Sequence, residues 1–555
     1  MSTTLAALIE KFGGRLADGT QASATGAEHT VLGIGLDSTK IAPREIFAAL
    51  PGTRTHGAEY AADTAAAAIL TDAAGAEILQ TRDENRPVWV VENVRAVLGH
   101  IAAEIYGHPS EKMTVIGITG TSGKTTTSYI LEAGLRAAGA KVGIIGTTGT
   151  RINGSKVPTS LTTPEAPKLQ RLFAMMLEQG VTHVVMEVSS HALELGRVAG
   201  TTFAVAGFSN LSQDHLDFHP TMEDYFQAKA RLFSGAQAAQ KAAIVTDEHW
   251  GQQMAQIAEQ HAASCWRVQT NLTEHSAASA DGAAGAPRAD VAVLAADLAA
   301  SGTQKVQLRL ADETVELDLP LPGSFNVANA ALACALAKLA DAGMSAFLHG
   351  VENVAVPGRM ESLAAGQDFV AVVDYAHKPG ALEAVLATLR GQVTGRVGVV
   401  VGCGGDRDSS KREIMGRIAA QQADYVVVTD DNPRTEDPAP IRAAIMAGAR
   451  EALQVAGRAP AEHVVEEGDR ARAIELLVDW AQPGDAIVVA GKGHETGQIV
   501  GDTVHEFDDR TVLAAALEAA GYSAAGDSAV SGNGGNGRAD DAGETDDAGE
   551  TEAKR

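Results

Sequence analysis

The sequence predicts an α/β protein of three domains, and three observations support this prediction. The chain has 555 residues, which is more than a single hydrophobic core usually organises. Short runs rich in valine and isoleucine alternate with helical stretches, the pattern of parallel sheets covered by helices. The segment "YGHPSEK" (106–112) interrupts this alternation, and a second series begins after "ENVAVPGRME" (352–361). We therefore predict domains at residues 1–110, 111–352 and 353–522.

The first predicted domain is alanine-rich α/β sequence that includes the strand-like "PVWVVEN". The second opens with "MTVIGITG", a β-branched strand that leads into a glycine turn and a helix, and we predict that its sheet is doubly wound. A surface loop is predicted near residues 275–287, at "EHSAASADGAAGAP". The third domain is predicted to be Rossmann-like and to end near Tyr522. The strands predicted for the last two domains are "KVGIIGTT", "THVVMEVSS", "FAVAGFSN", "KAAIVTD", "FVAVVDYAH", "GRVGVVVGCGG", "DYVVVTDDNP" and "DAIVVAGKGHE".

The composition is typical of a soluble globular protein, and we expect an enzyme of the cytoplasm. Hydrophobic residues make up 45% and charged residues 21% of the chain, and no apolar run reaches the roughly 18 residues of a membrane span. The N-terminal "MSTTLAALIEKFGG" lacks the basic region of a secretory signal. Cys265, Cys334 and Cys403 lie far apart without a C-x-x-C spacing, which predicts reduced thiols rather than disulfides or a zinc site.

The formal charge of −26 disfavours nonspecific binding to nucleic acid or to an anionic membrane. Anionic substrates would therefore need local basic pockets. Part of the acidity belongs to residues 523–555, where the hexapeptide DDAGET repeats and almost nothing apolar is available to bury. This composition predicts a disordered tail, with a docking segment as the alternative.

The stretch "GITGTSGKTTTSYI", Gly117 to Ile130, predicts a variant ATP loop. The usual P-loop spacing would place a glycine where the chain has Ile118. A strand, a glycine-rich turn and a helix N-terminus can still hold a polyphosphate through backbone N–H groups and the helix dipole. Lys124 adds a charge, and a hydroxyl of Thr125 or Thr126 can reach Mg²⁺. The residues predicted to contact ATP here are Gly120, Thr121, Ser122, Gly123, Lys124, Thr125 and Thr126.

Three further side chains suggest a magnesium site beside this loop. Glu187 ends the strand in "MEVSSHAL", His215 follows another strand in "SNLSQDHLDFH", and Lys229 lies on the amphipathic helix of "YFQAKARLF". A carboxylate and an imidazole at the carboxyl ends of parallel strands are well placed to hold Mg²⁺ between phosphates. Taken singly, Glu187 would be interpreted as a solvated side chain, His215 as a core histidine and Lys229 as a surface lysine.

Other candidate nucleotide contacts lie downstream. Asn326 and Asn329 stand three apart at the start of an alanine-rich helix, where their amides could read a purine edge. Helix capping by Asn326 is the plainer alternative. Arg359 in "PGRME" and Asp374 and His377 in "DYAHKP" are single residues near a strand, and each is weak evidence alone.

Together these motifs resemble the Mur ligases and their relative folylpolyglutamate synthase, whose ATP loop has this spacing. The resemblance covers the chain to about Tyr522, with the family's motifs in the family's order. It implies that Asn326 and Asn329 contact adenine, Asp374 the ribose, and Arg359 and His377 the phosphates. It also implies that Lys124, Glu187, His215 and Lys229 are catalytic, with Lys229 N-carbamylated. Thr125, Glu187, His215 and the carbamate would then bind Mg²⁺.

The turn "VVVTDDNPRTEDP" would ordinarily be only a strand-to-loop transition. In this family, D-N-P-R resembles the signature for meso-diaminopimelate, whose distal carboxylate calls for a guanidinium. By the same resemblance, "GCGGDRD" and "GKGHE" hold the zwitterionic end of that amino acid. The implied contacts are Arg407, Asp431, Asn432, Pro433, Arg434, Gly491 and Glu495.

Three segments resemble the family's contacts to the UDP-linked acceptor. "GLDSTK" is similar to the uracil and ribose contact, and "SLTTPEA" and "SSHALELGRV" to the contacts with the muramoyl dipeptide. The implied residues are Leu36, Ser38, Thr162, Thr163, Ser189 and Arg197.

The resemblance implies an ATP- and Mg²⁺-dependent ligase that joins meso-diaminopimelate to UDP-N-acetylmuramoyl-L-alanyl-D-glutamate through an acyl phosphate. Such an enzyme supplies peptidoglycan precursors, and through them cell shape and division, and we expect a cytoplasmic monomer. The alternatives are a lysine-adding ligase, a folylpolyglutamate synthase-like ligase and a catalytically inactive nucleotide-binding protein. The absence of "DNPR" and of the N-terminal uridine segment would have favoured folylpolyglutamate synthase.

Overall fold

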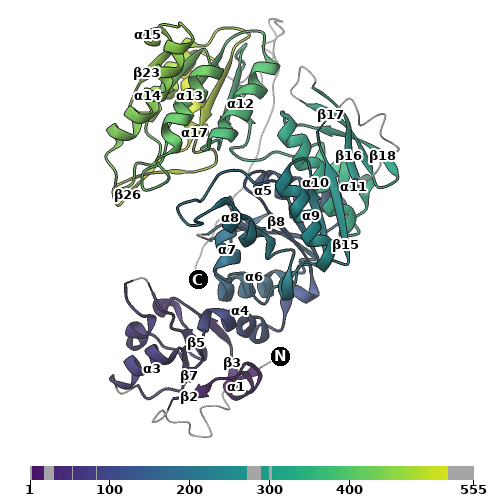
Figure 1. The fold of residues 1–555 in the computed structure, drawn as a ribbon, viewed down its shortest axis with the longest axis vertical. Coiled ribbons are helices and arrows are strands. Elements are labelled where there is room, and N and C mark those ends of the chain that lie inside the picture. Colours follow the sequence, from purple (N-terminus) through teal and green to yellow (C-terminus); the bar gives the residue numbers. More distant parts are fainter. Residues whose placement is uncertain are drawn as a thin grey trace, which may run out of the picture.

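The computed structural model describes residues 3–17, 30–52, 54–82, 84–159, 161–271, 289–298 and 303–522. They form three α/β units that follow one another along the long axis of the molecule (Figure 1). Each unit has its own sheet and its own hydrophobic core. The predicted surface loop near 275–287 and the predicted disordered tail at 523–555 lie outside the described residues.

The N-terminal unit is built on a five-stranded sheet in the order β2-β7-β6-β5-β4. Strands β4 to β7 are parallel and β2 pairs antiparallel with β7. Trp89 anchors the core, since its ring is fully buried and its Nε1 donates to Gly13 O at 2.9 Å. The elements are β1 (Thr3–Thr4), α1 (Leu5–Phe12), β2 (Arg15–Leu16), β3 (Thr30–Val31), β4 (Gly33–Gly35), η1 (Ser38–Lys40), β5 (Glu45–Ala48), η2 (Gly57–Asp63), β6 (Ala68–Thr71), α3 (Ala73–Gln80), β7 (Val88–Val90) and α4 (Val94–Ile105).

The middle unit carries an eleven-stranded sheet in the order β11-β10-β9-β12-β8-β13-β14-β15-β16-β17-β18. Within this order, the seven neighbouring strands β9, β12, β8, β13, β14, β15 and β16 are parallel. They include all five strands that the sequence predicts here. Antiparallel strands extend both edges, and the sequence analysis did not predict them. The strands are β8 (Thr114–Thr119), β9 (Val142–Gly146), β10 (Gly149–Ile152), β11 (Ser155–Val157), β12 (His183–Glu187), β13 (Val205–Phe208), β14 (Lys241–Val245), β15 (Ser264–Gln269), β16 (Val291–Leu298), β17 (Gln304–Leu310) and β18 (Glu313–Leu319).

Helices cover both faces of this sheet, as a doubly wound fold requires. One core packs α5, α10 and α11 against the sheet, and another packs α6, α8 and α9 against the opposite face. The alanine-rich α10 is buried along most of its length, which lets its backbone approach the strands closely. The helices are η3 (Pro109–Lys112), α5 (Lys124–Ala137), α6 (Ala166–Glu178), α7 (Ser190–Glu194), α8 (Met222–Ala230), η4 (Gly235–Gln237), α9 (His249–His261), α10 (Ser324–Leu339) and α11 (Met344–Val351).

The C-terminal unit has a six-stranded sheet in the order β19-β20-β24-β21-β22-β23, parallel except for β19. Its four predicted strands are β20, β24, β21 and β22. The hairpin β25–β26 was not predicted, and it lies at the end of this unit that faces the middle unit (Figure 1). The elements are β19 (Glu361–Ser362), β20 (Val370–Asp374), α12 (Pro379–Gln392), β21 (Val397–Val401), α13 (Lys411–Gln422), β22 (Tyr425–Val428), α14 (Pro438–Val455), α15 (Pro460–His463), β23 (Val464–Glu466), α16 (Arg470–Trp480), β24 (Ala486–Ala490), β25 (Gly497–Val500), β26 (Thr503–Glu506) and α17 (Asp509–Ala519).

No helix among the described ranges is long and apolar enough to cross a lipid bilayer. The three cysteines are free thiols in the structure, as the sequence predicts.

Arg470 and Asp509 form an ion pair between α16 and α17, with both side chains 0% exposed. Two hydrogen bonds of 2.8 Å join them. Arg470→Ala is expected to lower the free energy of unfolding by about 3–5 kcal/mol, because the carboxylate would stay buried without its cation. Arg472→Ala on the same helix breaks only a half-exposed pair with Glu475 and should cause a much smaller loss of stability. Urea denaturation measures the free energy of unfolding of both variants. Equal losses would contradict the larger contribution expected of the buried pair.

Candidate active site

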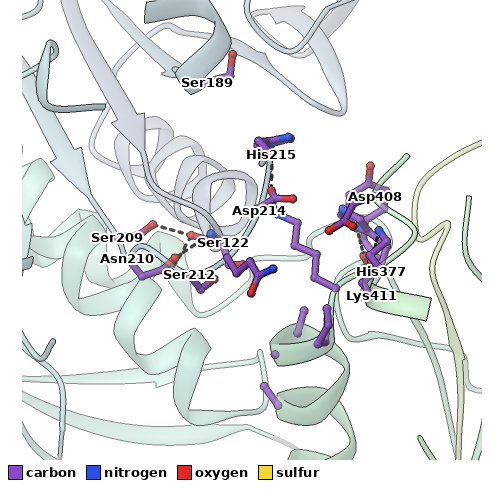
Figure 2. Close-up of a pocket in the computed structure, with 18 of the residues that line it drawn as sticks. Ser122, Ser189, Ser209, Asn210, Ser212, Asp214, His215, His377, Asp408 and Lys411 are labelled. Atoms are coloured by element: carbon purple, nitrogen blue, oxygen red, sulfur yellow. Dashed lines mark hydrogen bonds and ion pairs between the residues drawn. The ribbon is translucent and has the colours of Figure 1, made fainter. Parts of the chain in front are cut away.

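A cavity of about 1130 Å³ lies between the middle and C-terminal units. The carboxyl ends of parallel strands from both sheets meet there, which is where open α/β sheets bind ligands. Figure 2 shows the ATP loop at Ser122, the turn at Asp214 and His215, and the C-terminal unit's His377, Asp408 and Lys411 around this space. The predicted residues that line it are Ser122, Gly123, Thr126, Thr162, Thr163, Ser189, Arg197, His215, Asn326, Asn329, Arg359, Asp374, His377, Arg407, Asp431, Asn432, Arg434, Gly491 and Glu495.

The predicted residues that do not line this cavity are Leu36, Ser38, Gly120, Thr121, Lys124, Thr125, Glu187, Lys229 and Pro433. Leu36 packs partly buried against the core of the N-terminal unit, and Ser38 begins η1, so neither lines this cavity. The side chains of Thr125, Glu187 and Lys229 are buried beneath the loop. The structure therefore brings together most of the residues predicted to contact ATP and the amino acid. It does not bring Leu36 and Ser38, the two predicted uridine contacts, to this cavity.

The ATP loop connects β8 to α5 with two glycines at positive φ, Gly120 at 145° and Gly123 at 86°. A Cβ at Gly120 would collide with Ser209, and one at Gly123 with Asn329, so both positions require glycine. Lys124 lies back over the loop, where its Nζ donates to Gly120 O at 2.8 Å and Thr121 O at 3.1 Å. Burial, together with the nearby Lys378 charge, lowers the pKa of Lys124 to about 8. An incoming polyphosphate can compete for this ammonium.

The turn after β13 holds the loop in place. Asn210 accepts from the N–H of Ser122 through Oδ1 and from the N–H of Thr121 through its carbonyl, both at 2.9 Å. Ser209 Oγ donates to Ser122 O at 2.6 Å (Figure 2). The sequence analysis missed both residues, although the polar "SN" directly after a buried strand was a signal.

Glu187 ends β12 and is buried against the start of α5. Its Oε1 accepts from Thr125 Oγ1 and from the N–H of Thr147, and its Oε2 accepts from Thr147 Oγ1, each at 2.9 Å. A carboxylate and a hydroxyl thus meet at the root of the ATP loop. Such oxygen donors are the protein ligands that Mg²⁺ prefers.

His215 belongs to a cluster of polar and charged side chains that two units contribute. Its Nε2 lies 3.0 Å from Asp214 Oδ2 (Figure 2). Lys378 of the C-terminal unit places its Nζ 2.5 Å from the same oxygen. Burial lowers the pKa of His215 to about 3, so this imidazole is neutral at pH 7. Burial alone would raise the pKa of Asp214, but Lys378 and His215 outweigh it and hold that pKa well below its usual range.

Lys229 is 1% exposed, so the alternative of a surface lysine is wrong. Its Nζ donates to Gly120 O at 3.0 Å and lies 4.3 Å from the centroid of the Tyr225 ring. Burial, with Lys124 and Lys378 nearby, holds the pKa of Lys229 far below its ordinary value. This shift favours the neutral, nucleophilic amine over the ammonium.

The predicted metal set is only partly assembled. Thr125 and Glu187 are in contact, whereas His215 and Lys229 bond to Asp214 and Gly120. Within the described ranges, no three His, Cys, Asp or Glu side chains converge as a metal cluster.

Helix capping by Asn326 is wrong, because α10 begins at Ser324 and Gly323 is its N-cap. Asn326 lies inside the first turn, where its Nδ2 donates to Pro322 O at 2.7 Å. Its Oδ1 accepts from Asn329 Nδ2 at 3.2 Å, and Asn329 faces Gly123 of the ATP loop. Both amides thus lie on the helix face beside the loop.

On the other side of the cavity, the Arg359 guanidinium lies 4.4 Å over the Tyr375 ring. Asp374 Oδ2 accepts from the N–H of Met360 at 2.7 Å, and burial raises the pKa of Asp374. Burial holds the pKa of His377 far below its ordinary value, so this side chain is neutral. The cation that reaches the ATP loop from this turn is Lys378, which the sequence analysis missed.

The candidate acceptor residues are tied to β12 and α7. Thr163 Oγ1 donates to Glu187 O at 2.9 Å, and Thr162 Oγ1 lies 3.3 Å from Thr147 Oγ1. Ser189 caps α7, since its Oγ accepts from the N–H of Ala192 at 3.2 Å. Arg197 Nε lies 2.8 Å from Glu165 Oε1.

The "DNPR" turn forms the far end of the cavity. Arg434 has a φ of 53°, and its Nη1 donates to Gly405 O at 2.7 Å. Asn432 Nδ2 donates to Glu495 Oε2 at 2.8 Å. Gly491 has a φ of 121°, and a Cβ there would lie 2.9 Å from Asp431 Oδ2. A guanidinium and two carboxylates therefore lie close together at this end of the cavity, an arrangement that suits a zwitterion. Arg407 is exposed at the rim.

Three family models match the chain: "Mur ligase family, catalytic domain" over residues 30–106, "Mur ligase middle domain" over 118–337, and "Mur ligase, glutamate ligase domain" over 358–493. The UDP-N-acetylmuramoyl-L-alanyl-D-glutamate–2,6-diaminopimelate ligase of Corynebacterium glutamicum is 56% identical over 508 residues, covering 90% of this chain and 94% of the relative. The enzyme of that name from Streptomyces coelicolor is 44% identical over 532 residues, covering 93% and 97%.

A solved structure of a ligase with the same name is similar at a TM-score of 0.63 and 30% identity, covering 94% of this chain and 100% of that one. Folylpolyglutamate synthase of Mycobacterium tuberculosis, solved with ADP and AMPPCP, is similar at a TM-score of 0.56 and 20% identity. That match covers 71% of this chain and 91% of the synthase, and it supports the fold alone.

Proposed function

The chain belongs to the Mur ligase family, and we propose that it is the ATP-dependent ligase that adds meso-diaminopimelate to UDP-N-acetylmuramoyl-L-alanyl-D-glutamate. The observation that carries this function is one cavity that joins the ATP loop to the "DNPR" turn. Relatives named for this reaction match nearly the whole chain. The reaction supplies the peptidoglycan precursor, and we place it in the cytoplasm with the protein acting as a monomer.

In this proposal each unit binds one substrate, and the units correspond to residues 1–110, 111–352 and 353–522. The N-terminal unit holds the uridine end of the acceptor near Leu36 and Ser38. Thr162, Thr163, Ser189 and Arg197 direct the dipeptide toward the ATP loop. ATP lies between the loop residues 120–126 and the C-terminal unit, with adenine at Asn326 and Asn329. Its ribose lies at Asp374, and Arg359 and His377 lie near the phosphates.

The residues at the root of the loop fit Mg²⁺. Thr125 and Glu187 supply a hydroxyl and a carboxylate in contact with each other, and the neutral imidazole of His215 lines the cavity beside the loop. These residues would hold the ion, and when bound it would neutralise charge on the phosphates.

We propose that Lys229 is N-carbamylated. Its neutral amine can attack CO₂: an N–C bond forms, one C–O π bond becomes an oxyanion, and the nitrogen loses a proton. The product is a carboxylate-like group directly beside Gly120, where the free amine now donates. A carbamate there would be a ligand for a second Mg²⁺.

The reaction then follows from positioning and electrostatics. An oxygen of the D-Glu γ-carboxylate attacks the γ-phosphorus of ATP, and ADP leaves with the electrons of the broken P–O bond. Lys124, already at the loop and partly titrated near neutral pH, stabilises the charge that develops on the phosphoryl oxygens. The amine of diaminopimelate, having lost its proton, attacks the acyl carbon. Phosphate leaves with the former carboxylate oxygen, and an amide remains.

The test is ADP release with each substrate omitted in turn, and with diaminopimelate, lysine or ornithine as the amine. The proposal predicts sustained ADP release only with ATP, the UDP-muramoyl dipeptide and diaminopimelate together. Turnover with lysine at the same rate would instead favour the lysine-adding ligase. Turnover with a folate acceptor would favour the folylpolyglutamate synthase-like ligase. Nucleotide binding without turnover would favour an inactive binding protein.

A further inference from the structure

Lys492 is a fully buried lysine that no step of the proposed reaction uses. It is the second residue after β24, between Gly491 and Glu495 in "GKGHE", and its side chain is 0% exposed. Burying an ammonium is costly unless acceptors surround it. A lysine kept at such a position therefore indicates that its surroundings were built to receive it.

All three N–H groups of this ammonium have acceptors inside the protein. Lys492 Nζ donates to Gly497 O at 2.6 Å, to Asn432 Oδ1 at 3.2 Å and to Glu495 Oε2 at 3.3 Å. An ammonium has three donors, so none is left for a substrate. Lys492 therefore acts on the cavity only through the groups it holds.

The first of these groups is the side-chain amide of Asn432, which is 5% exposed. Its Oδ1 accepts from Lys492 Nζ and, at 2.9 Å, from the N–H of Ile499. Two donors on one side fix the amide oxygen there, so the amide nitrogen must face the other way. Nδ2 donates one hydrogen to Glu495 Oε2 and has a second to offer.

The second group is a pair of carboxylates. Glu495 Oε2 accepts from both Lys492 and Asn432, which leaves Oε1 for a ligand. Asp431 is 6% exposed and lines the same cavity, yet its Oδ1 is buried without a hydrogen-bond partner. Lys492 Nζ lies 3.9 Å from that oxygen, too far to satisfy it. A buried carboxylate oxygen in this state is ready to accept from an ammonium.

The hairpin β25–β26 completes the frame. The N–H of Ile499 already donates to Asn432 Oδ1. In addition, Ile499 O accepts from the N–H of Arg434 at 3.0 Å, and the N–H of Gly501 donates to Arg434 O at 2.7 Å. Gln498 Nε2 donates to Asp431 O at 2.9 Å. Lys492 ties this hairpin to the turn through Gly497 O. The hairpin and Lys492 thus hold the "DNPR" turn from behind.

Resting on the proposed function, we propose that Lys492 is the positioning residue of the amino-acid pocket. It orients the Asn432 amide and one oxygen of Glu495. The free N–H of Asn432 and the open oxygens of Asp431 and Glu495 then face one carboxylate-and-ammonium end of the diamino acid. The positive charge of Lys492 also reduces the repulsion between these two carboxylates before substrate arrives.

Steady-state kinetics with Lys492→Met, Asn432→Ala and the double variant test this role. Lys492→Met is expected to raise the KM for diaminopimelate about tenfold or more and to leave those for ATP and the UDP precursor within about threefold. Because Lys492 acts partly through Asn432, the loss in the double variant should be smaller than the product of the two single losses. Independent, multiplying effects would overturn the proposal, as would an unchanged KM in folded Lys492→Met.

Two further variants keep the result interpretable. Arg396→Met removes a cation at the opposite end of the same sheet, where it pairs with Asp485 at 2.7 Å, and should leave the KM for diaminopimelate unchanged. If Lys492→Met does not fold, Asn432→Asp decides, because it keeps an acceptor for Lys492 but replaces the N–H that faces Glu495. Its KM for diaminopimelate should rise, and an unchanged value overturns the proposal. Ligation by the wild type, measured in parallel, separates failure of this role from failure of the proposed function.

Discussion

Lys229→Ala is expected to lower turnover on the order of 10²-fold or more, while the protein stays folded. The lysine is 1% exposed, and its amine donates to Gly120 O of the ATP loop. In the proposed reaction its carbamate binds a metal beside the phosphates, and alanine cannot replace it. The measurement is kcat with all three substrates at saturation, together with a melting temperature for the variant.

Lys229→Met is the matched control, because methionine fills most of the space but has no amine. If the amine matters, both variants lose activity alike, and CO₂-depleted wild-type protein regains activity when bicarbonate is added. If Lys229 only fills the core against Tyr225, methionine should restore the rate. A wild-type rate in Lys229→Met would refute the carbamate.

Arg434→Ala should raise the KM for diaminopimelate by roughly 30-fold to several thousandfold, which corresponds to about 2–5 kcal/mol for a lost, desolvated charge pair. Its guanidinium lines the cavity at the carboxyl end of β22, where it can pair with the distal carboxylate that lysine lacks. The KM values for ATP and the UDP precursor should stay near those of the wild type. Lysine use need not improve, because Asp431 and Asn432 would remain arranged around an absent partner.

Arg434 also holds its own turn, since Nη1 donates to Gly405 O at 2.7 Å. Arg434→Lys separates the two roles: it keeps a charge but loses the two-pronged geometry, and its KM for diaminopimelate should fall between wild type and alanine. If the arginine only secures the turn, Arg434→Ala should instead impair all three substrates alike and lower the melting temperature. An unchanged preference for diaminopimelate over lysine would rule out the selection role.

Nine parallel strands of the middle and C-terminal units could be predicted because each is a short buried run that ends in a polar turn, whereas the parallel strands β15, β16 and β23 were missed. The same property drew attention to Glu187 and His215, since residues after parallel strands gather at one edge, whereas Asp431 was named through the resemblance to the Mur ligases. The ATP loop could be predicted because its glycines are required locally: Gly123 has a φ of 86° and no room for a side chain.

Other features depend on contacts that sequence spacing does not reveal. Strands β25 and β26 are four residues each and largely exposed, so they carry no apolar pattern. Lys378 of the C-terminal unit pairs with Asp214 of the middle unit, a contact between residues far apart in sequence. Lys492 lies in a glycine-rich turn, which from sequence alone suggests exposure to solvent, but the fold buries it. Capping by Asn326 was the plainer alternative from sequence, but it is wrong because the helix starts two residues earlier, at Ser324.

The fate of the γ-carboxylate oxygens of the D-Glu residue tests the proposed reaction most directly. With ¹⁸O in that carboxylate, each amide bond formed through an acyl phosphate transfers one labelled oxygen to the released phosphate, which mass spectrometry detects. We expect ADP and singly labelled phosphate in equal amounts, and only when diaminopimelate is present. Unlabelled phosphate, or AMP in place of ADP, would contradict an acyl phosphate at this site.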